Sequence, residues 1–285
     1  MSSTKLNFTE ASRLLFITQS TLSQSIRQTE GELGIQLFER IGKKVYLTDV
    51  GQAFLPFARQ AIIETETSIQ KLRDMQQIYK GELRIGVIYS LCPMLAESIV
   101  RFSKEYPEIK LILTQSTSIN DVTIMLHENE VDFALAYKLD TFSSSTEVVD
   151  LFPDPLCLIV HERSPLAALK KISIQALTHY PLALLKPGSY TRKMIEKIAM
   201  ESGISLQPMA EINDTNLLLQ MVHTGDWISI LSQHSVDSHP ELRAVPLKEK
   251  GGNMQVSLLQ LKGRYKKMVA QKFIEIIQDT TSHKI

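Results

Sequence analysis

A long helical pattern between residues 50 and 79 divides this sequence into three parts. Thr48 is placed to cap such a helix, Pro56 is expected to kink its early turns, and Lys80-Gly81 ends it. A short segment precedes the pattern and a much larger region follows it. The apolar positions recur at mostly three- and four-residue steps, a coiled-coil-like seam made of Phe54, Ala58, Ala61, Thr65, Ile69, Leu72 and Tyr79.

This connector helix is too long to bury its seam on the small segment before it. Pairing with the same helix of a second chain is the simplest explanation, so the pattern predicts a homodimer. The alternative is a helix that packs only within its own chain.

Composition describes an ordinary globular protein that is large enough for two domains. The chain has 285 residues, of which 44% are hydrophobic and 22% charged. No stretch resembles a signal peptide or a membrane span, which favours a cytoplasmic protein. Cys92 and Cys157 stand far apart in apolar surroundings, which argues against a disulfide framework or a thiolate metal site.

Net charge does not identify a partner. Lys+Arg and Asp+Glu both number 31, so the bulk basicity of many nucleic-acid binders is missing. Residues 1–60 hold seven basic against five acidic side chains. Any DNA-binding role must therefore rest on where these charges lie.

The N-terminal segment predicts two short helices. Thr9 is placed to cap the first helix and Thr18 the second, which Gly34 ends. On a helical wheel the second helix has an apolar stripe for packing and an opposite face without carboxylates before Glu30. Amides, hydroxyls and guanidinium groups read base edges and phosphates, although a generic polar helix face is the alternative. The stripe contains Leu22, Ile26, Thr29 and Leu33, and the polar face contains Gln19, Ser20, Ser23, Gln24 and Arg27.

A hairpin is expected next, around Gly42. Two short β-prone runs flank this glycine, and Arg40, Lys43 and Lys44 form a basic cluster there. Such a wing suits the DNA backbone beside a groove, while a solvated turn is the alternative.

Residues 8–51 resemble the N-terminal signature of LysR-type transcriptional regulators. The resemblance rests on Phe8-Thr9-Glu10-Ala11, Gln19 to Ser23, Ile26-Arg27, Glu30, Glu32-Leu33-Gly34, Leu37 to Arg40, Leu47-Thr48 and Gly51. It implies a winged helix-turn-helix that binds promoter or operator DNA, with no cofactor, and a dimer or tetramer joined through the connector helix and the effector domain. The implied DNA-binding residues are Gln19, Ser20, Thr21, Ser23, Gln24, Arg27, Arg40, Lys43 and Lys44.

The family has a further helix before the region that starts here at Lys5. Either the true start lies upstream or this domain lacks a packing partner. We expect a version extended upstream to bind DNA more tightly than this chain.

After residue 80 the pattern changes to alternating strands and helices, which indicates an α/β domain with a parallel sheet. Extended segments are expected at 83–88, 109–114, 131–137, 156–160, 174–177, 182–185, 227–231 and 256–261. Helices are expected at 94–106, 120–129, 191–202, 215–224 and 266–279. This order resembles the periplasmic-binding-protein-like effector domain of the same family.

The resemblance implies three domains and a small-molecule effector between two lobes. A DNA-binding domain would span residues 1–50 and the linker helix 51–80. The effector domain would span 81–285, with lobe 1 at about 83–150 and 255–285 and lobe 2 at about 152–250.

Ligands of such sheets bind at the carboxyl ends of strands, near helix N-termini. This rule selects residues whose hydroxyls and backbone amides suit a small anion or polar molecule. Each of them taken alone is more often a turn or cap residue. The selected residues are Tyr89, Ser90, Leu91, Ser116, Thr117, Ser118, Tyr137, Ser189, Tyr190 and Thr191.

Other classes of function find little support. We find no phosphate loop, nucleophile elbow or paired-cysteine metal spacing, so neither an enzyme nor a metal site is expected. A solute-binding protein would not need residues 8–48. Cys92 at a helix start suggests a redox-sensing thiolate, with a buried inert thiol as the alternative.

Overall fold

Two parts of the chain pack as separate units, and each is described here by itself. The structure is a computed structural model that describes residues 7–41, 44–76 and 79–282. One unit is Met1–Gln70 and the other is Lys71–Ile285.

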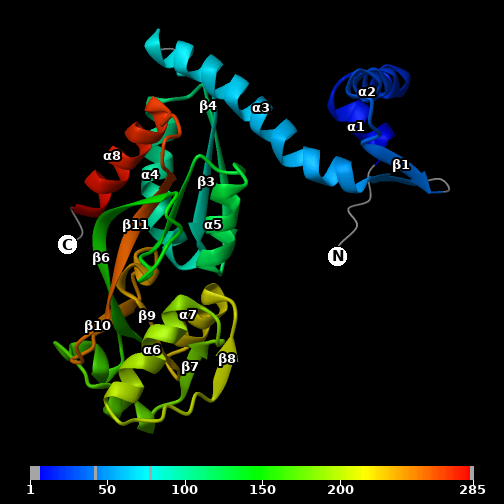
Figure 1. The fold of residues 1–285 in the computed structure, drawn as a ribbon. Helices are drawn as coiled ribbons and strands as arrows, with labels where there is room; N and C mark the ends of the chain where they lie inside the picture. The colour runs from blue at the N-terminus through cyan, green and yellow to red at the C-terminus, as the bar shows by residue number, and fades with distance from the viewer. Residues whose placement is uncertain (1–6, 42–43, 77–78, 283–285) are drawn as a thin grey trace. The chain divides into compact units, whose positions relative to one another are not determined.

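The first unit contains two helices, a hairpin and most of the connector helix (Figure 1). Asn7 caps the first helix by accepting from the N–H groups of Thr9 and Glu10, so the expected cap at Thr9 is wrong. Thr18 caps the second helix, and Gly34 ends it with a φ of 69°. The elements are α1 (Phe8–Leu14), α2 (Gln19–Leu33), β1 (Phe38–Ile41), β2 (Lys44–Leu47) and α3 (Asp49–Met75).

Glu30 fixes the hairpin to α2. One of its carboxylate oxygens accepts from the backbone N–H groups of Leu37, at 2.8 Å, and Phe38, at 3.0 Å. β1 and β2 pair in antiparallel register, which confirms the expected hairpin. Thr48 caps α3 by accepting from the N–H of Gly51 at 2.9 Å, as expected.

The apolar seam of α3 lies largely uncovered within one chain. Its members Ala61, Ile69 and Leu72 are exposed, while Phe54 and Ala58 are half-buried. The helix continues through Pro56 and ends at Met75, one turn before the expected end at Tyr79. Exposed apolar surface of this kind is unfavourable in water, and covering it with another apolar surface is stabilising.

In the second unit, the described residues form a nine-stranded sheet in the order β4-β3-β5-β11-β6-β9-β7-β8, with β10 paired to β6. β3 is parallel to β4 and β5, and β7 is parallel to β8 and β9. β6, β10 and β11 pair in antiparallel fashion, so the expected parallel sheet is in fact mixed. The strands are β3 (Gly81–Ile88), β4 (Ile109–Ser116), β5 (Phe133–Tyr137), β6 (Thr146–His161), β7 (Leu182–Leu185), β8 (Ala210–Ile212), β9 (Ile228–Ser232), β10 (Leu242–Pro246) and β11 (Asn253–Leu261).

The helices of this unit cover the sheet in two groups. In Figure 1, α4, α5 and α8 lie with β3 and β4, whereas α6 and α7 lie with β7 and β8. Residues 174–177, expected as a strand, belong instead to a 3-10 helix. The helices are η1 (Tyr89–Leu91), α4 (Cys92–Glu105), α5 (Ile119–His127), η2 (Pro165–Ala168), η3 (Ile174–His179), α6 (Tyr190–Glu201), α7 (Thr215–His223), η4 (Gln233–Val236) and α8 (Met268–Ser282).

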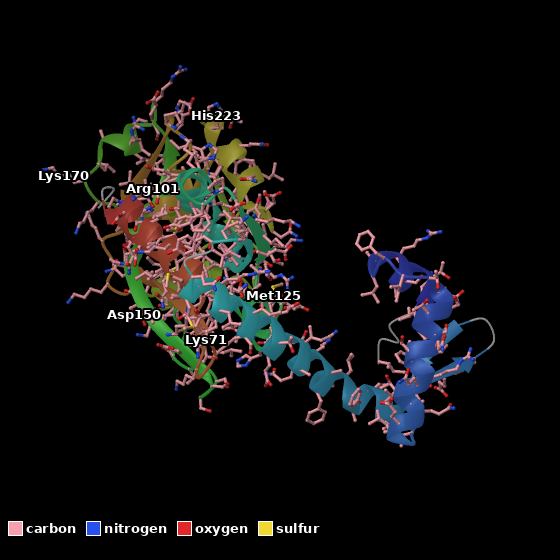
Figure 2. All side chains as sticks on the ribbon, turned by 90° about the horizontal axis from the view of Figure 1, so that it is seen from above. Lys71, Arg101, Met125, Asp150, Lys170 and His223 are labelled. Atoms are coloured by element: carbon pink, nitrogen blue, oxygen red, sulfur yellow. The ribbon has the colours of Figure 1, made fainter. Side chains whose placement is uncertain are left out.

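β6 joins the two groups. Its first part pairs with β11 up to Pro155, and its second part pairs with β9 from Leu156 onward. Buried apolar side chains of both groups form one main core, and a second, smaller cluster packs α7 against β6, β7 and β9. Figure 2 shows how densely side chains occupy this unit. The unit therefore has two lobes built on a shared strand.

Candidate functional site

The exposed face of α2 carries long side chains that are available for a partner. Gln19, Gln24 and Arg27 are exposed, and none of them has a side-chain hydrogen bond or ion pair within the described residues. Ser20 and Thr21 are also exposed, and their hydroxyls each lie 2.8 Å from that of Thr18. This face has donors and acceptors but no carboxylate.

Ser23 does not belong to that face. It is 8% exposed and lies on the packed side, next to Leu22 and Ile26. Thr29 and Leu33, expected in the packed stripe, are exposed instead. Because Glu30 turns inward to bind the amides that lead into β1, the packed side is rotated from the position that the wheel predicts.

The basic cluster expected on the wing can be followed only in part. Arg40 and Lys44 lie on β1 and β2, at either side of the hairpin turn. Lys43 lies outside the described residues, as do the side chains of Arg40 and Lys44.

A cavity of about 240 Å³ lies between the lobes of the second unit. β3 and β4 from one lobe and β7 and β8 from the other end at this cavity, as expected for an α/β sheet. Six residues selected from the sequence line it: Tyr89, Ser90, Thr117, Ser189, Tyr190 and Thr191. Its other lining residues are Ile88, Ile119, Leu185, Lys186, Pro187, Gly188, Asn213 and Thr215.

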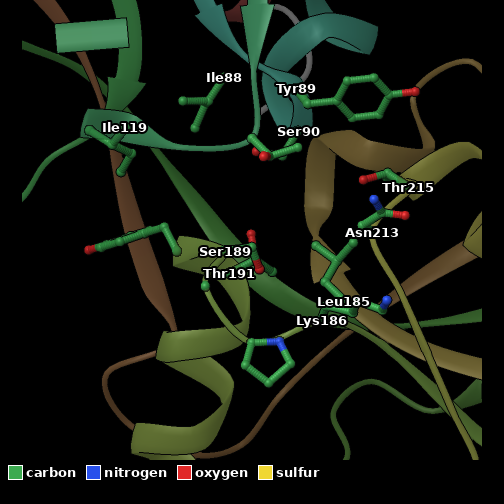
Figure 3. Close-up of a pocket in the computed structure, with 14 residues that line it drawn as sticks. Ile88, Tyr89, Ser90, Ile119, Leu185, Lys186, Ser189, Thr191, Asn213 and Thr215 are labelled. Carbon is green, nitrogen blue, oxygen red and sulfur yellow. The ribbon is translucent and has the colours of Figure 1, made fainter. Parts of the chain in front are cut away.

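The cavity combines hydroxyl groups with one cation. Figure 3 shows Ser90 on one side, facing Ser189 and Thr191 on the other. Lys186 is exposed and has no ion-pair partner among the residues that the structure describes. This arrangement favours a ligand with at least one negative charge.

Helix N-termini add to the positive character of the cavity. α5, α6 and α7 all begin at lining residues, and their first N–H groups lack partners within the helix. Ser189 caps α6 by accepting from the N–H of Arg192 at 3.1 Å. Asp214 caps α7 beside the cavity and offsets part of this field.

Two tyrosines connect the lobes beside the cavity. The hydroxyl of Tyr89 accepts from the side-chain amide of Asn216 at 2.7 Å, and the hydroxyl of Tyr190 donates to the carbonyl of Lys138 at 3.0 Å. Burial, followed by the charge of Asp214, raises the pKa of Tyr89. Both phenols are therefore neutral at pH 7, and the proton of Tyr190 is already used by the carbonyl of Lys138.

Arg192 holds the floor of the cavity in place. It is almost fully buried, and its guanidinium donates to the carbonyl of Leu185 at 2.9 Å and pairs with Glu211 on β8 at 2.8 Å. A buried cation with these bonds joins the carboxyl ends of β7 and β8.

Four residues selected from the sequence lie outside the cavity lining. Ser118 caps α5, where its hydroxyl accepts from the N–H of Asp121 at 3.4 Å. Leu91 is fully buried in the core. The Ser116 hydroxyl turns away to donate to Asp121 at 2.8 Å. Tyr137 is fully buried and donates to Asp154, also at 2.8 Å, so its hydroxyl already has a partner. Burial raises the pKa of both Tyr137 and Asp154.

Lys186, Asn213 and Thr215 line the cavity but were not predicted from the sequence. All three follow short strands, β7 or β8, and β8 is only three residues long. The signal was the polar run Asn213-Asp214-Thr215 before an apolar helix, a pattern typical of an N-cap.

The redox hypothesis for Cys92 is wrong in its physical premise. Burial raises the pKa of this thiol to about 11, whereas a sensing cysteine needs a lowered pKa. Cys92 is half-buried and its thiol donates to the carbonyl of Ile88 at 3.8 Å, so the inert thiol is the better description.

Metal-ligand clusters and membrane-spanning helices are absent from the part of the chain that the structure describes. No three His, Cys, Asp or Glu side chains are placed there to hold a metal ion. None of the helices there has the length and apolar character needed to cross a membrane.

Comparison with known proteins finds matches in both units. The family model described as "Bacterial regulatory helix-turn-helix protein, lysR family" matches residues 3–52, and the one described as "LysR substrate binding domain" matches residues 76–282. The HTH-type transcriptional activator CmpR of Synechocystis is 30% identical over 81% of this chain and 75% of its own length.

Solved structures share the fold. CbnR, solved in complex with its target DNA, has a TM-score of 0.64 at 20% identity and covers 96% of this chain and 94% of its own. The regulatory domain of Synechocystis CcmR, solved in complex with 2-PG, has a TM-score of 0.61 at 22% identity. That match covers 71% of this chain and 98% of the CcmR domain.

Proposed function

This chain belongs to the LysR family of bacterial helix-turn-helix regulators, and from that premise we propose how its parts divide the work. The protein is a sequence-specific DNA-binding regulator that responds to a small molecule. Residues 1–50 bind DNA, 51–80 form the connector, and 81–285 bind the effector, with lobe 1 at 83–150 and 255–285 and lobe 2 at 152–250. Such a regulator acts in the cytoplasm, where its DNA is.

We propose that α2 enters the major groove with its exposed face. Gln19 and Gln24 suit bidentate pairing with adenine, and Arg27 suits guanine or a phosphate. Ser20 and Thr21 lie at the helix N-terminus, where backbone amides bind phosphate. Arg40, Lys43 and Lys44 contact the neighbouring backbone. The observation that carries the proposal is the free polar face formed by Gln19, Gln24 and Arg27.

We propose that the effector is a small anion held between the lobes. Lys186 supplies the charge, and Ser90, Thr117 and Thr191 supply hydrogen bonds. Ile88, Ile119 and Leu185 offer an apolar wall for the rest of the molecule. The neighbour CcmR was solved with 2-PG, so this compound is a reasonable first probe.

We further propose that two chains pair through the exposed seam of α3. Pairing would cover Ile69 and Leu72 and would space two copies of α2 for two half-sites on one DNA. A dimer, or a tetramer that also uses the effector domain, meets this requirement.

A binding titration of the full-length protein tests the proposal. The DNA is the region upstream of its own gene, and 2-PG and inorganic phosphate are added in turn as probes. We expect preference for this DNA over a scrambled duplex, and a change in affinity with a probe that also raises the Tm. Lys186→Ala should abolish the rise in Tm. Equal affinity for both duplexes at low ionic strength would overturn the DNA-binding role.

A further inference from the structure

The last turn of α3 has its acidic side chain inside and its apolar and basic side chains outside. Asp74 is 2% exposed, whereas Leu72 is 64% and Met75 is 75% exposed. A buried carboxylate costs free energy unless it is hydrogen-bonded or paired. This reversal of the usual pattern indicates that contacts of Asp74 hold the turn in place.

Those contacts lie at the start of α8. Oδ2 of Asp74 accepts from the backbone N–H of Met268 at 2.9 Å and from the hydroxyl of Tyr265 at 2.7 Å. Met268 is the first residue of α8, and the first N–H groups of a helix lack partners within it. The helix dipole also stabilises a negative charge there. Asp74 therefore caps α8 from a position 194 residues away.

The pKa of Tyr265 reflects its hydrogen bond to Asp74. Burial and the hydrogen bond to Asp74 raise the pKa of Tyr265 to about 12. Tyr79 adds a second link, because its hydroxyl lies 3.3 Å from the sulfur of Met268. The end of the connector helix and the start of α8 therefore form one packed corner.

α8 in turn packs along α4. The hydroxyls of Ser98 and Thr280 are 2.7 Å apart in a buried contact, and the rings of Phe102 and Phe273 meet edge to face with centroids 5.1 Å apart. α4 begins directly after η1, whose residues Tyr89 and Ser90 line the cavity. Because protein interiors are close-packed and transmit displacement, this is a continuous route from the cavity to Asp74.

We propose that Asp74 is the positioning residue through which a change at the cavity reaches the connector helix. This inference rests on the proposed function, since it assumes that the cavity holds an effector. Residues 71–75 belong to the effector unit, and the earlier part of α3 belongs to the other unit. The Asp74 cap thus attaches the effector unit's part of α3 to α8, close to the point where α3 passes into the other unit.

Hydrogen exchange on the full-length protein tests the cap itself. Asp74→Ala should speed exchange of the amides in 71–76 and 268–271 about tenfold, the usual scale for a lost N-cap. Asp74→Asn should have a smaller effect, because its amide oxygen still accepts a hydrogen bond. The matched control is Asp279→Ala, which removes an exposed carboxylate near the other end of α8. Unchanged exchange in Asp74→Ala would overturn the cap.

A reporter driven by the DNA upstream of the protein's own gene tests the positioning role. Asp74→Ala should keep its DNA affinity within about twofold yet change reporter output at least about fivefold, the lower range of allosteric coupling. Asp74→Asn should restore part of the response. Faster exchange with unaltered output would refute the positioning role and leave the cap purely structural. Failure of the wild type to bind this DNA would overturn the proposed function, while exchange would still decide the cap.

Discussion

Replacing Gly51 with alanine is expected to push the wing away from the connector helix. A Cβ at this position would overlap the carbonyl oxygen of Leu37, and it would lie 2.9 Å from the carbonyl carbon of Leu37 and 3.1 Å from Cδ2 of Leu47. The obstacle is backbone rather than a flexible side chain, so α3 must shift. The 3.0 Å bond from the N–H of Thr48 to the carbonyl of Leu37 would then lengthen.

The expected magnitude follows from these contacts. Overpacking costs about 1–3 kcal/mol, and the weakened hydrogen bond adds about 1 kcal/mol. The better helix propensity of alanine returns about 1 kcal/mol, so the net loss of stability is about 1–3 kcal/mol. In a unit the size of Met1–Gln70, each 1 kcal/mol of lost stability lowers the Tm by about 4–8 °C. Scanning calorimetry of the full chain, with hydrogen exchange over residues 37–51, measures the effect.

Gly31→Ala is the matched control. Gly31 lies within α2, is exposed, and has no atom within 4 Å of an added Cβ. It should gain about 0.5–1 kcal/mol from helix propensity alone. If Gly51→Ala melts at or above the Tm of Gly31→Ala, the added Cβ does not clash with the backbone of Leu37.

Three further predictions concern the candidate sites. In an anisotropy titration, Arg27→Ala should weaken binding to the preferred DNA by about 1–3 kcal/mol. Arg27→Lys should recover only part of the lost affinity, because lysine is a point charge. Unaltered affinity of Arg27→Ala would exclude Arg27 from the interface. Lys186→Ala should remove any rise in Tm caused by 2-PG or phosphate, whereas Lys170→Ala, outside the cavity lining, should not; equal shifts would exclude Lys186 as the charge partner. Because the pKa of Cys92 is raised to about 11, iodoacetamide should modify it slowly at pH 7.5 and faster as the pH rises toward 11, with urea-unfolded protein as control; equal rates at pH 7.5 would contradict the burial argument.

Local signals in the sequence predicted most of the first unit. Thr18 and Thr48 were identified as caps, and Gly34 as a helix end, because each effect acts within one turn of helix. The orientation of α2 was not predictable in the same way. It depends on Glu30 binding amides that lie seven and eight residues away, so Ser23 was assigned to the wrong face.

The second unit shows where such signals end. Strand ends correctly brought Tyr89, Thr117 and Tyr190 to the cavity, because the rule for α/β sheets depends only on strand direction. Tyr137 stands at a strand end as well, but its hydroxyl is used by Asp154, a partner 17 residues away. The part of β6 before residue 156 was not predicted as a strand. Pro153 and Pro155 lie in this part, and prolines usually argue against a strand.

Base substitution across the preferred DNA site decides whether the exposed face of α2 reads DNA bases. Each base pair of the site is changed in turn, and affinities are measured for the wild type and Gln24→Ala. We predict that one substitution costs the wild type about 1–3 kcal/mol and costs Gln24→Ala almost nothing, because the side chain that reads this base pair is gone. The opposite result is a Gln24→Ala protein that discriminates between base pairs as well as the wild type at every position. If Gln19→Ala and Arg27→Ala gave the same result, the exposed face of α2 would not read DNA bases.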